Sequence, residues 1–340
     1  MTFPLDEISG RGSTLWRYRE AIPVEDDASI VSLGEGMTPL VPFDDPGRGH
    51  YLKLDFIAAT GSYKDRGASV LLSKLVELDV REVVEDSSGN AGAAVAAYSA
   101  RAGIGCTIYC PASTSKGKLA QIGVYGGRLK LIKGNRAATT EAVLEAAETT
   151  YYASHNWNPF FLEGTKTVAF EIAEQLGWSA PDHVICPIGF GSVYLGLYIG
   201  FGELYAGGIV EKMPRLLGVQ SAACSPIYTA YSENRRVKRT PQRYETLAEG
   251  IAAEYPIRGE MILEAQRETD GAFTVVSEED IVAGIKVLAA RGVYVEPTSA
   301  AVVKAFDRFV EERVIGRGDT VVSILTGSGL KATEKLMKIL

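Results

Sequence analysis

Histidine and cysteine are scarce in this chain of 340 residues, which contains three histidines and four cysteines. No two cysteines form a Cys-x-x-Cys pair, so neither a zinc ribbon nor a dithiol redox motif is indicated. Cys106 and Cys110 fall on one face of a strand-like run, which favours a reduced pair in the core. The few histidines make a histidine-rich metal site or a Ser-His-Asp triad hard to assemble. We therefore expect no metal centre and a catalytic base of another residue type.

Long apolar runs and dense positive charge are also missing. The formal net charge is −7, and 23% of the residues are charged. Neither a nucleic acid nor a membrane is therefore an expected partner. No signal-peptide pattern is present, so we expect a cytoplasmic protein. The densest basic run, Arg235–Arg239, could bind an anion, but we favour a solvated loop, because surface loops concentrate charge.

Short apolar runs alternate with helical patterns along most of the chain, which is typical of a parallel α/β sheet. Ligands of such sheets bind at the carboxyl ends of the strands, so the residues that follow each strand are the first candidates for a site. The expected strands are 82–85, 105–110, 129–132, 183–187, 215–220 and 320–325. The expected helices are 91–102, 118–123, 136–149, 167–176, 193–204 and 277–291, the last with Ser277 as its N-cap.

Lys64 stands in a segment built around one amine, Thr60-Gly61-Ser62-Tyr63-Lys64-Asp65-Arg66-Gly67. Glycines flank the lysine at both ends, a hydroxyl precedes it and an ion pair follows it. An amine held in this way can form a Schiff base with pyridoxal phosphate (PLP) and then act as a base. On this segment alone, a solvated lysine at the start of a helix is the alternative.

A second segment, Asp86-Ser87-Ser88-Gly89-Asn90-Ala91-Gly92, lies between an expected strand and an expected helix. Backbone N–H groups at such a helix start can bind an anion, typically a carboxylate. The Asn90 amide can donate to a phenolic oxygen. The alternative is an ordinary helix start with Ser87 or Ser88 as its N-cap.

Two further segments follow strands in the second half of the chain. In Pro187–Gly196, Gly189 and Gly191 allow close approach of the backbone to a ligand, and the helix start favours a phosphate. The segment lacks the GxGxxG pattern of dinucleotide binding. In Ile324–Lys331, Thr326 offers a hydroxyl at a strand end. A plain turn is the alternative for both segments.

Taken together, these segments resemble PLP-dependent enzymes of the tryptophan-synthase-β fold type, and among them the threonine synthase group. The resemblance covers most of the chain. It extends to further motifs at residues 15–20, 32–40, 117–121 and 163–167. Residues 295–301, with Pro297 near the start of an expected helix, indicate an ordinary helix start.

The resemblance implies a fold type II α/β protein with two lobes, each an open, mostly parallel twisted sheet flanked by helices. The smaller lobe would span 51–162, and the larger would span 13–50 with 163–340. The resemblance also implies a homodimer. No further cofactor is expected beside PLP.

The resemblance also implies roles for individual residues. Lys64 would carry PLP as a Schiff base and shuttle protons. Asn90 would bind the 3-oxygen of PLP, and Thr326 would face its pyridine nitrogen. The backbone of Gly189, Phe190, Gly191, Ser192 and Val193 would bind the 5′-phosphate. Ser87, Ser88, Gly89, Asn90 and Ala91 would bind the substrate carboxylate.

The chain departs from the threonine synthase pattern where a substrate phosphate would bind. Phe161 stands where that family usually carries an arginine, and Ala91 where it usually carries a threonine. Both expected anion contacts are therefore missing, and charge-assisted contacts are about twice as strong as neutral ones. Lys116, Lys118 or Arg66 could supply compensating charge. His155 could reach the site or be a packed core histidine.

We therefore expect a PLP-dependent synthase or lyase acting at the β or γ carbon of an activated amino acid, with conversion of O-phosphohomoserine to threonine as the default. One alternative is β-replacement on O-phosphoserine or an acyl-serine, which would make cysteate, cysteine or diaminopropionate. Another is a threonine or serine dehydratase. A catalytically silent relative that binds a metabolite stays open, and an NAD-dependent oxidoreductase is a more distant alternative.

Overall fold

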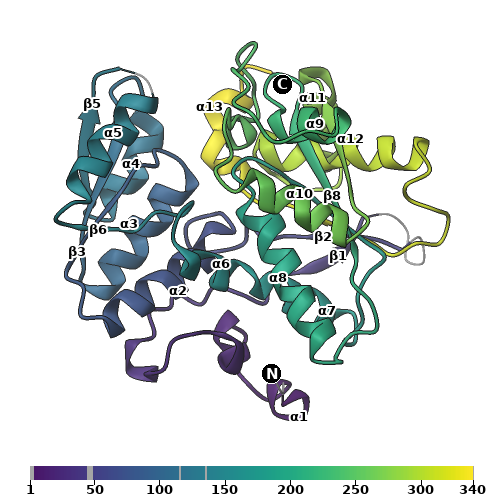
Figure 1. Cartoon of the computed structure of the whole chain (residues 1–340), viewed down its shortest axis with the longest axis horizontal. Helices are drawn as coiled ribbons and strands as arrows, with labels where there is room; N and C mark the ends of the chain where they lie inside the picture. Colours follow the sequence, from purple (N-terminus) through teal and green to yellow (C-terminus); the bar gives the residue numbers. More distant parts are fainter. Residues whose placement is uncertain (1–3, 44–48, 115, 135, 340) are drawn as a thin grey trace. The chain divides into compact units, whose positions relative to one another are not determined.

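The computed structural model describes residues 4–43, 49–114, 116–134 and 136–339. Contacts between residues divide them into two compact units (Figure 1). The smaller unit comprises Pro4–Met37 and Ala58–Thr165, and the larger unit comprises Thr38–Ile57 and the chain from Lys166 onward. Both units are α/β structures.

The larger unit contains a six-stranded sheet with the strand order β1-β2-β10-β7-β8-β9. Only β1 runs antiparallel to its neighbour, and all other pairs are parallel. The expected mostly parallel sheet is therefore confirmed. The strands are β1 (Leu40–Pro42), β2 (His50–Lys53), β7 (His183–Pro187), β8 (Arg215–Ser221), β9 (Ala272–Val276) and β10 (Val321–Ile324). The helices are α7 (Thr167–Gln175), α8 (Ser192–Ala206), α9 (Pro226–Ser232), η3 (Glu249–Ile251), α10 (Gly259–Glu268), α11 (Glu278–Ala289), α12 (Pro297–Glu311), η4 (Gly329–Ala332) and α13 (Thr333–Leu336).

The smaller unit contains a four-stranded sheet, β5-β4-β3-β6, in which all strands are parallel. Its strands are β3 (Glu82–Glu85), β4 (Gly105–Pro111), β5 (Arg128–Ile132) and β6 (Tyr151–Tyr152). Its helices are α1 (Leu5–Ile8), η1 (Leu15–Ala21), η2 (Asp27–Ser29), α2 (Lys64–Glu77), α3 (Asn90–Ala102), α4 (Lys116–Val124), α5 (Arg136–Ala146) and α6 (Pro159–Thr165).

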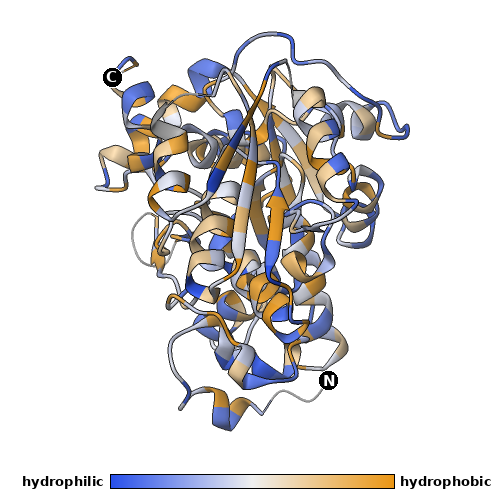
Figure 2. Cartoon of the chain, turned by 90° about the vertical axis from the view of Figure 1, so that its left-hand side faces the viewer, coloured by the Kyte–Doolittle hydropathy of each residue, from blue (hydrophilic) through white to orange (hydrophobic). Residues whose placement is uncertain are grey.

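Each unit has its own apolar core. In Figure 2 the apolar colour is concentrated in the strands and the helix segments beside them, whereas loops and outer helix ends are largely polar. The four cysteines are buried, Cys106 and Cys110 in the smaller unit and Cys186 and Cys224 in the larger. The expected position of Cys106 and Cys110 in the core is therefore confirmed. Among the described residues, no helix is both long enough and apolar enough to cross a membrane.

The boundaries of the two units differ from the predicted lobes 51–162 and 13–50 with 163–340. Strand β2 pairs with β10 in parallel, and residues 38–57 lie in the larger unit. Of these, residues 51–57 fall within the predicted smaller lobe. Residues 13–37 instead belong to the smaller unit, where the indole N–H of Trp16 donates to Ser69 of α2. Both differences arise from contacts between residues far apart in sequence, which periodicity does not reveal.

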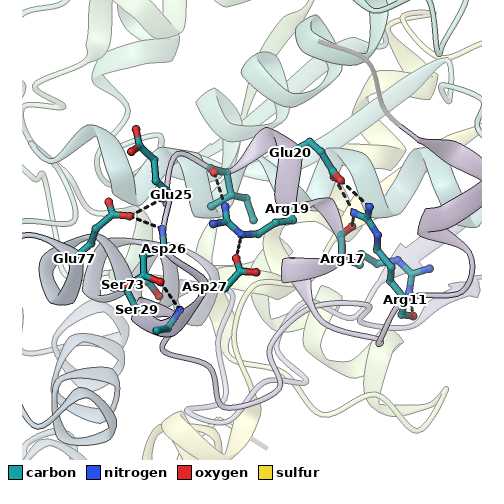
Figure 3. A network of polar contacts seen from close by, with 12 residues as sticks. Arg11, Arg17, Arg19, Glu20, Glu25, Asp26, Asp27, Ser29, Ser73 and Glu77 are labelled. Atoms are coloured by element: carbon teal, nitrogen blue, oxygen red, sulfur yellow. Dashed lines mark hydrogen bonds and ion pairs between the residues drawn. The ribbon is translucent and has the colours of Figure 1, made fainter.

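Polar contacts hold the N-terminal segment against α2 (Figure 3). The Glu77 carboxylate accepts hydrogen bonds from the backbone N–H groups of Glu25 and Asp26. The Ser73 hydroxyl accepts one from the N–H of Val31. Glu25, Asp26 and Val31 are therefore held at the C-terminal half of α2, away from Lys64.

Candidate cofactor site

Lys64 is the first residue of α2, and its amine lies between two aromatic rings. The Nζ atom is 4.8 Å from the ring centroid of Tyr63 and 5.4 Å from that of Phe161. Phe161 is fully buried, and its ring fills the space beside Gly67, where an added Cβ would come within 2.4 Å of it. The absence of a side chain at Gly67 thus allows the Phe161 ring to approach the start of α2.

The loop before Lys64 is closed by Asp65. Its buried carboxylate accepts from the Thr60 N–H at 2.8 Å and also from the Thr60 hydroxyl. Within this loop, the Ser62 Oγ is buried and has no hydrogen-bond partner among the described residues. A buried hydroxyl without a partner is costly, so a ligand near Lys64 that bonded to Ser62 would remove that cost.

The segment after β3 does not start α3 in the ordinary way. The N-cap is Gly89, and no side chain of the described residues caps this helix, so the interpretation of Ser87 or Ser88 as the N-cap is wrong. The Ser87 hydroxyl instead accepts from the Gly89 N–H at 3.3 Å. An added Cβ at Gly92 would lie 1.8 Å from the Ser87 carbonyl oxygen, so the loop folds tightly onto the helix start. The N–H groups of the first turn of α3 can thus face an anion.

His155 is a packed histidine of the smaller unit. Its Nδ1 lies 2.5 Å from the buried Glu85 carboxylate, and its ring contacts the Phe161 ring edge-on with centroids 6.0 Å apart. Glu85 immediately precedes the segment 86–92. These contacts connect Phe161, and with it the Lys64 amine, to the strand end that carries Ser87 and Asn90.

In the larger unit, the glycine-rich turn after β7 leads into α8. Gly191 is the N-cap with φ of 88°, a left-handed conformation that favours glycine. An added Cβ at Gly189 would lie 2.4 Å from the Gly250 carbonyl oxygen, and one at Gly191 would lie 2.3 Å from the Ile262 side chain. No side chain caps α8 in the described part of the chain. The turn is therefore a compact backbone cradle whose N–H groups suit a phosphate.

Thr326 follows β10 and is buried beside Ser299 of α12, with the two hydroxyl oxygens 3.2 Å apart. The Ser299 oxygen already accepts from the N–H groups of Thr326 and Gly327, both at 2.9 Å. A hydroxyl oxygen has two lone pairs, so Ser299 has no acceptor site left for the Thr326 proton. The Thr326 hydroxyl can therefore donate to a ligand atom such as a ring nitrogen.

The sequence indicated Lys64, the segment 86–92, the glycine-rich turn and Thr326, but not how they are held. The structure adds Ser62 as a buried polar group and Ser299 as the residue that orients Thr326. The sequence had pointed to the Ser62 hydroxyl only as the hydroxyl that precedes Lys64, and Ser299 lies within residues 295–301, which indicated no more than an ordinary helix start. Arg235, Arg236 and Arg239 each lie near a glutamate, which fits a solvated loop.

The residues present fit a cofactor that carries an aldehyde, a phosphate and a ring nitrogen. The amine of Lys64 can react with the aldehyde, the backbone cradle at Gly189–Val193 can bind the phosphate, and the Thr326 hydroxyl can donate to the nitrogen. PLP is the cofactor with this combination of groups. The residues of each unit, taken separately, are therefore compatible with PLP.

Comparison with known proteins agrees with PLP as the cofactor. The family model described as "Pyridoxal-phosphate dependent enzyme" matches residues 31–327, and the chain belongs to that family. The chain is 36% identical to the threonine synthase of Methanocaldococcus jannaschii, over 98% of this chain and 84% of that protein. It is 34% identical to the threonine synthase of Mycobacterium tuberculosis, over 94% of this chain and 89% of that protein.

Solved structures show the same fold. The processed form of threonine deaminase isoform 2 from Solanum lycopersicum superposes with a TM-score of 0.78 at 22% identity, covering 97% of this chain and 90% of that one. Maize serine racemase superposes with a TM-score of 0.77 at 20% identity, covering 96% and 98%. The protein is thus a PLP-dependent lyase similar to threonine synthases, as the sequence predicted.

Proposed function

We propose that the enzyme catalyses elimination or replacement at the β or γ carbon of an activated amino acid, with O-phosphohomoserine to threonine as the default reaction. The observation that carries the proposal is the Lys64 amine at the start of α2, within 5.4 Å of the ring centroid at position 161. The threonine synthases named above support the default, since they match almost the whole chain.

The proposed PLP-binding residues form two sets, which would serve one cofactor. Lys64 and Asn90 belong to the smaller unit, whereas Gly189–Val193 and Thr326 belong to the larger. The family match spans residues 31–327 and thus includes both sets, which supports their joint action. Lys64 would hold the cofactor covalently, Asn90 its 3-oxygen, the glycine-rich turn its phosphate and Thr326 its ring nitrogen.

The chemistry divides between the cofactor and the chain. When bound, PLP stabilises the electron pair left at Cα after loss of its proton. The Lys64 amine would take that proton and return one to the substrate. Ser87, Ser88, Gly89, Asn90 and Ala91 would hold the substrate carboxylate and fix its Cα–H bond relative to Lys64. The Thr326 hydroxyl is uncharged, so it would contact the ring nitrogen without the negative charge that a carboxylate would bring, and this would favour elimination over transamination.

Gly92→Ala tests the proposed carboxylate loop. The added Cβ would meet the Ser87 carbonyl oxygen at 1.8 Å, so the loop must move away from the helix start. We expect at least a tenfold rise in KM for the amino-acid substrate, about 1.4 kcal/mol of lost binding. The control is Gly123→Ala in α4, where an added Cβ meets nothing within 4 Å. An unchanged KM in a folded Gly92→Ala enzyme would contradict the role of the loop.

Phe161 favours a second candidate, an unphosphorylated β-substituted amino acid such as serine, threonine or an acyl-serine. The apolar ring lies beside the Lys64 amine, and Ala91 offers only a methyl group in the first turn of α3. The His155 ring, which contacts the Phe161 ring, is bonded to the buried Glu85 carboxylate, so it is already engaged by a carboxylate. A phosphate dianion gains little from such surroundings.

A substrate panel separates the two candidates. O-phosphohomoserine, O-phosphoserine, acetylserine, serine and threonine would each be added to the PLP-loaded enzyme, and changes in the cofactor absorbance and products would be recorded. Efficient threonine formation from O-phosphohomoserine supports the default, and Phe161→Arg should then change little. If only the unphosphorylated amino acids react, Phe161→Arg should weaken their binding and improve that of the phosphate esters.

A further inference from the structure

Glu35 is a buried carboxylate to which the site described above assigns no role. It lies in the smaller unit, only 2% exposed, within the segment Ser32–Leu40. Its backbone is also fixed, because its carbonyl oxygen accepts from the Leu15 N–H at 2.8 Å. Gly36 has φ of 111°, and an added Cβ there would lie 2.2 Å from the Leu15 nitrogen. The chain around Glu35 is thus tightly constrained.

The two carboxylate oxygens of Glu35 contact different helices. Oε1 accepts from the hydroxyl of Ser69 on α2 at 2.5 Å and from the Trp16 indole at 3.2 Å. Oε2 accepts from the phenol of Tyr98 on α3 at 2.7 Å and from the Leu33 N–H at 2.8 Å. Burial, together with the charges of Asp65 and Glu35, raises the pKa of Tyr98 well above its ordinary value, so the phenol stays a donor.

These two helices carry the proposed cofactor residues at their first positions. Lys64 begins α2 and Asn90 begins α3. Along the helix axes, Ser69 is about 7.5 Å from Lys64 and Tyr98 about 12 Å from Asn90, at 1.5 Å per residue. One carboxylate therefore fixes α2 relative to α3 within one or two turns of the residues that would act on the cofactor.

We propose that Glu35 is a positioning residue that sets the spacing and rotation of α2 against α3, and so holds Lys64 and Asn90 in register for one cofactor. The inference rests on the proposed roles of Lys64 and Asn90. A carboxylate is suited to this task, because it accepts from all of these donors at once and donates to none. Glutamine would direct an N–H₂ group toward hydroxyl and N–H donors, leaving at least one buried donor without its acceptor.

Glu35→Gln and a matched control, Glu77→Gln, test the proposal. Glu77 also ties the N-terminal segment to α2, through the N–H groups of Glu25 and Asp26 (Figure 3). It lies at the far end of the helix, about 20 Å from Lys64 at 1.5 Å per residue. Both variants should lower the melting temperature. Only Glu35→Gln should also disturb the starts of α2 and α3.

Two measurements on the full-length protein decide the outcome. One is the PLP dissociation constant of the apoprotein, and the other is amide hydrogen exchange of residues 60–66 and 87–92 in the apoprotein. For Glu35→Gln we expect at least a tenfold weaker PLP affinity and faster exchange in both segments, whereas Glu77→Gln should match the wild type in both. A Glu35→Gln protein that loses thermal stability alone would overturn the proposal.

Two milder variants keep the proposal testable if Glu35→Gln fails to fold. Tyr98→Phe removes the contact of Glu35 to α3, and Ser69→Ala removes its contact to α2 together with the contacts of the Ser69 hydroxyl to Trp16 and Val31. Each should weaken PLP binding and speed exchange at both helix starts, and wild-type values for both variants would overturn the proposal. A wild-type protein that binds no PLP would instead refute the proposed function, while the exchange data would still report on the coupling of the two helices.

Discussion

Replacement of Lys64 by alanine is expected to abolish covalent attachment of PLP and to lower kcat by about 10²–10⁴-fold or more, the range for loss of a positioned acid–base group. The amine lies at the start of α2, close to the rings of Tyr63 and Phe161. The loop before Lys64 is closed by Asp65, whose carboxylate accepts from the Thr60 N–H. Loss of this amine removes both the attachment point and the proposed base.

Borohydride reduction followed by peptide mass analysis measures the attachment directly. The wild type should carry reduced cofactor on Lys64, and Lys64→Ala should carry none. Lys74→Ala is the control, since Lys74 lies on the same helix and pairs with Glu77 near its other end. Cofactor fixed at another lysine in the wild type, or full activity of Lys64→Ala, would refute the assignment of the site.

Lys53→Met is expected to destabilise the larger unit by about 3–5 kcal/mol, because it leaves a buried carboxylate without its cation. Lys53 and Glu171 are both fully buried, with Nζ and Oε2 2.8 Å apart. The ammonium also donates to the Thr38 carbonyl oxygen at 2.7 Å and to the Gln175 side chain at 2.8 Å. All three ammonium protons are thus used, so no other side chain can replace the lysine.

Urea denaturation measures this loss of stability. The double variant Lys53→Met/Glu171→Leu removes both charges and should recover much of the loss, because a well-packed apolar pair often equals a buried ion pair in stability. A single variant as stable as the wild type would show that solvent or a rearranged neighbour compensates Glu171. A double variant less stable than the single one would show that the contacts of Glu171 to other groups, such as the Thr38 N–H, outweigh its charge.

The sequence predicted the strand, turn and helix order of the candidate segments well because each segment is local. A strand, a turn with glycine or hydroxyl residues and a helix start follow one another within about a dozen residues, and periodicity reveals that order. In the structure, α3 begins at Asn90, one residue before the predicted start at 91, and α8 begins at Ser192, one residue before the predicted start at 193. Such offsets are typical of helix ends.

Contacts between distant residues could not be predicted in the same way. Ser299 orients Thr326 across 27 residues, and Glu35 contacts Tyr98 across 63. Strand β2 pairs with β10, near the other end of the chain, and this pairing places residues 51–57 in the larger unit instead of the smaller one. Neither residue type nor spacing encodes these partners in a single sequence. The residues that hold the candidate site in place are therefore the part that only the structure reveals.

The four buried cysteines can serve as native probes of local unfolding. Burial raises the pKa of the Cys106 thiol to about 12 and that of Cys224 to about 11, so almost no thiolate exists at neutral pH. A thiol reagent can therefore react only while the surrounding structure is open. Because each unit holds two of these thiols, the order in which they become labelled records which unit opens first, without any engineered probe.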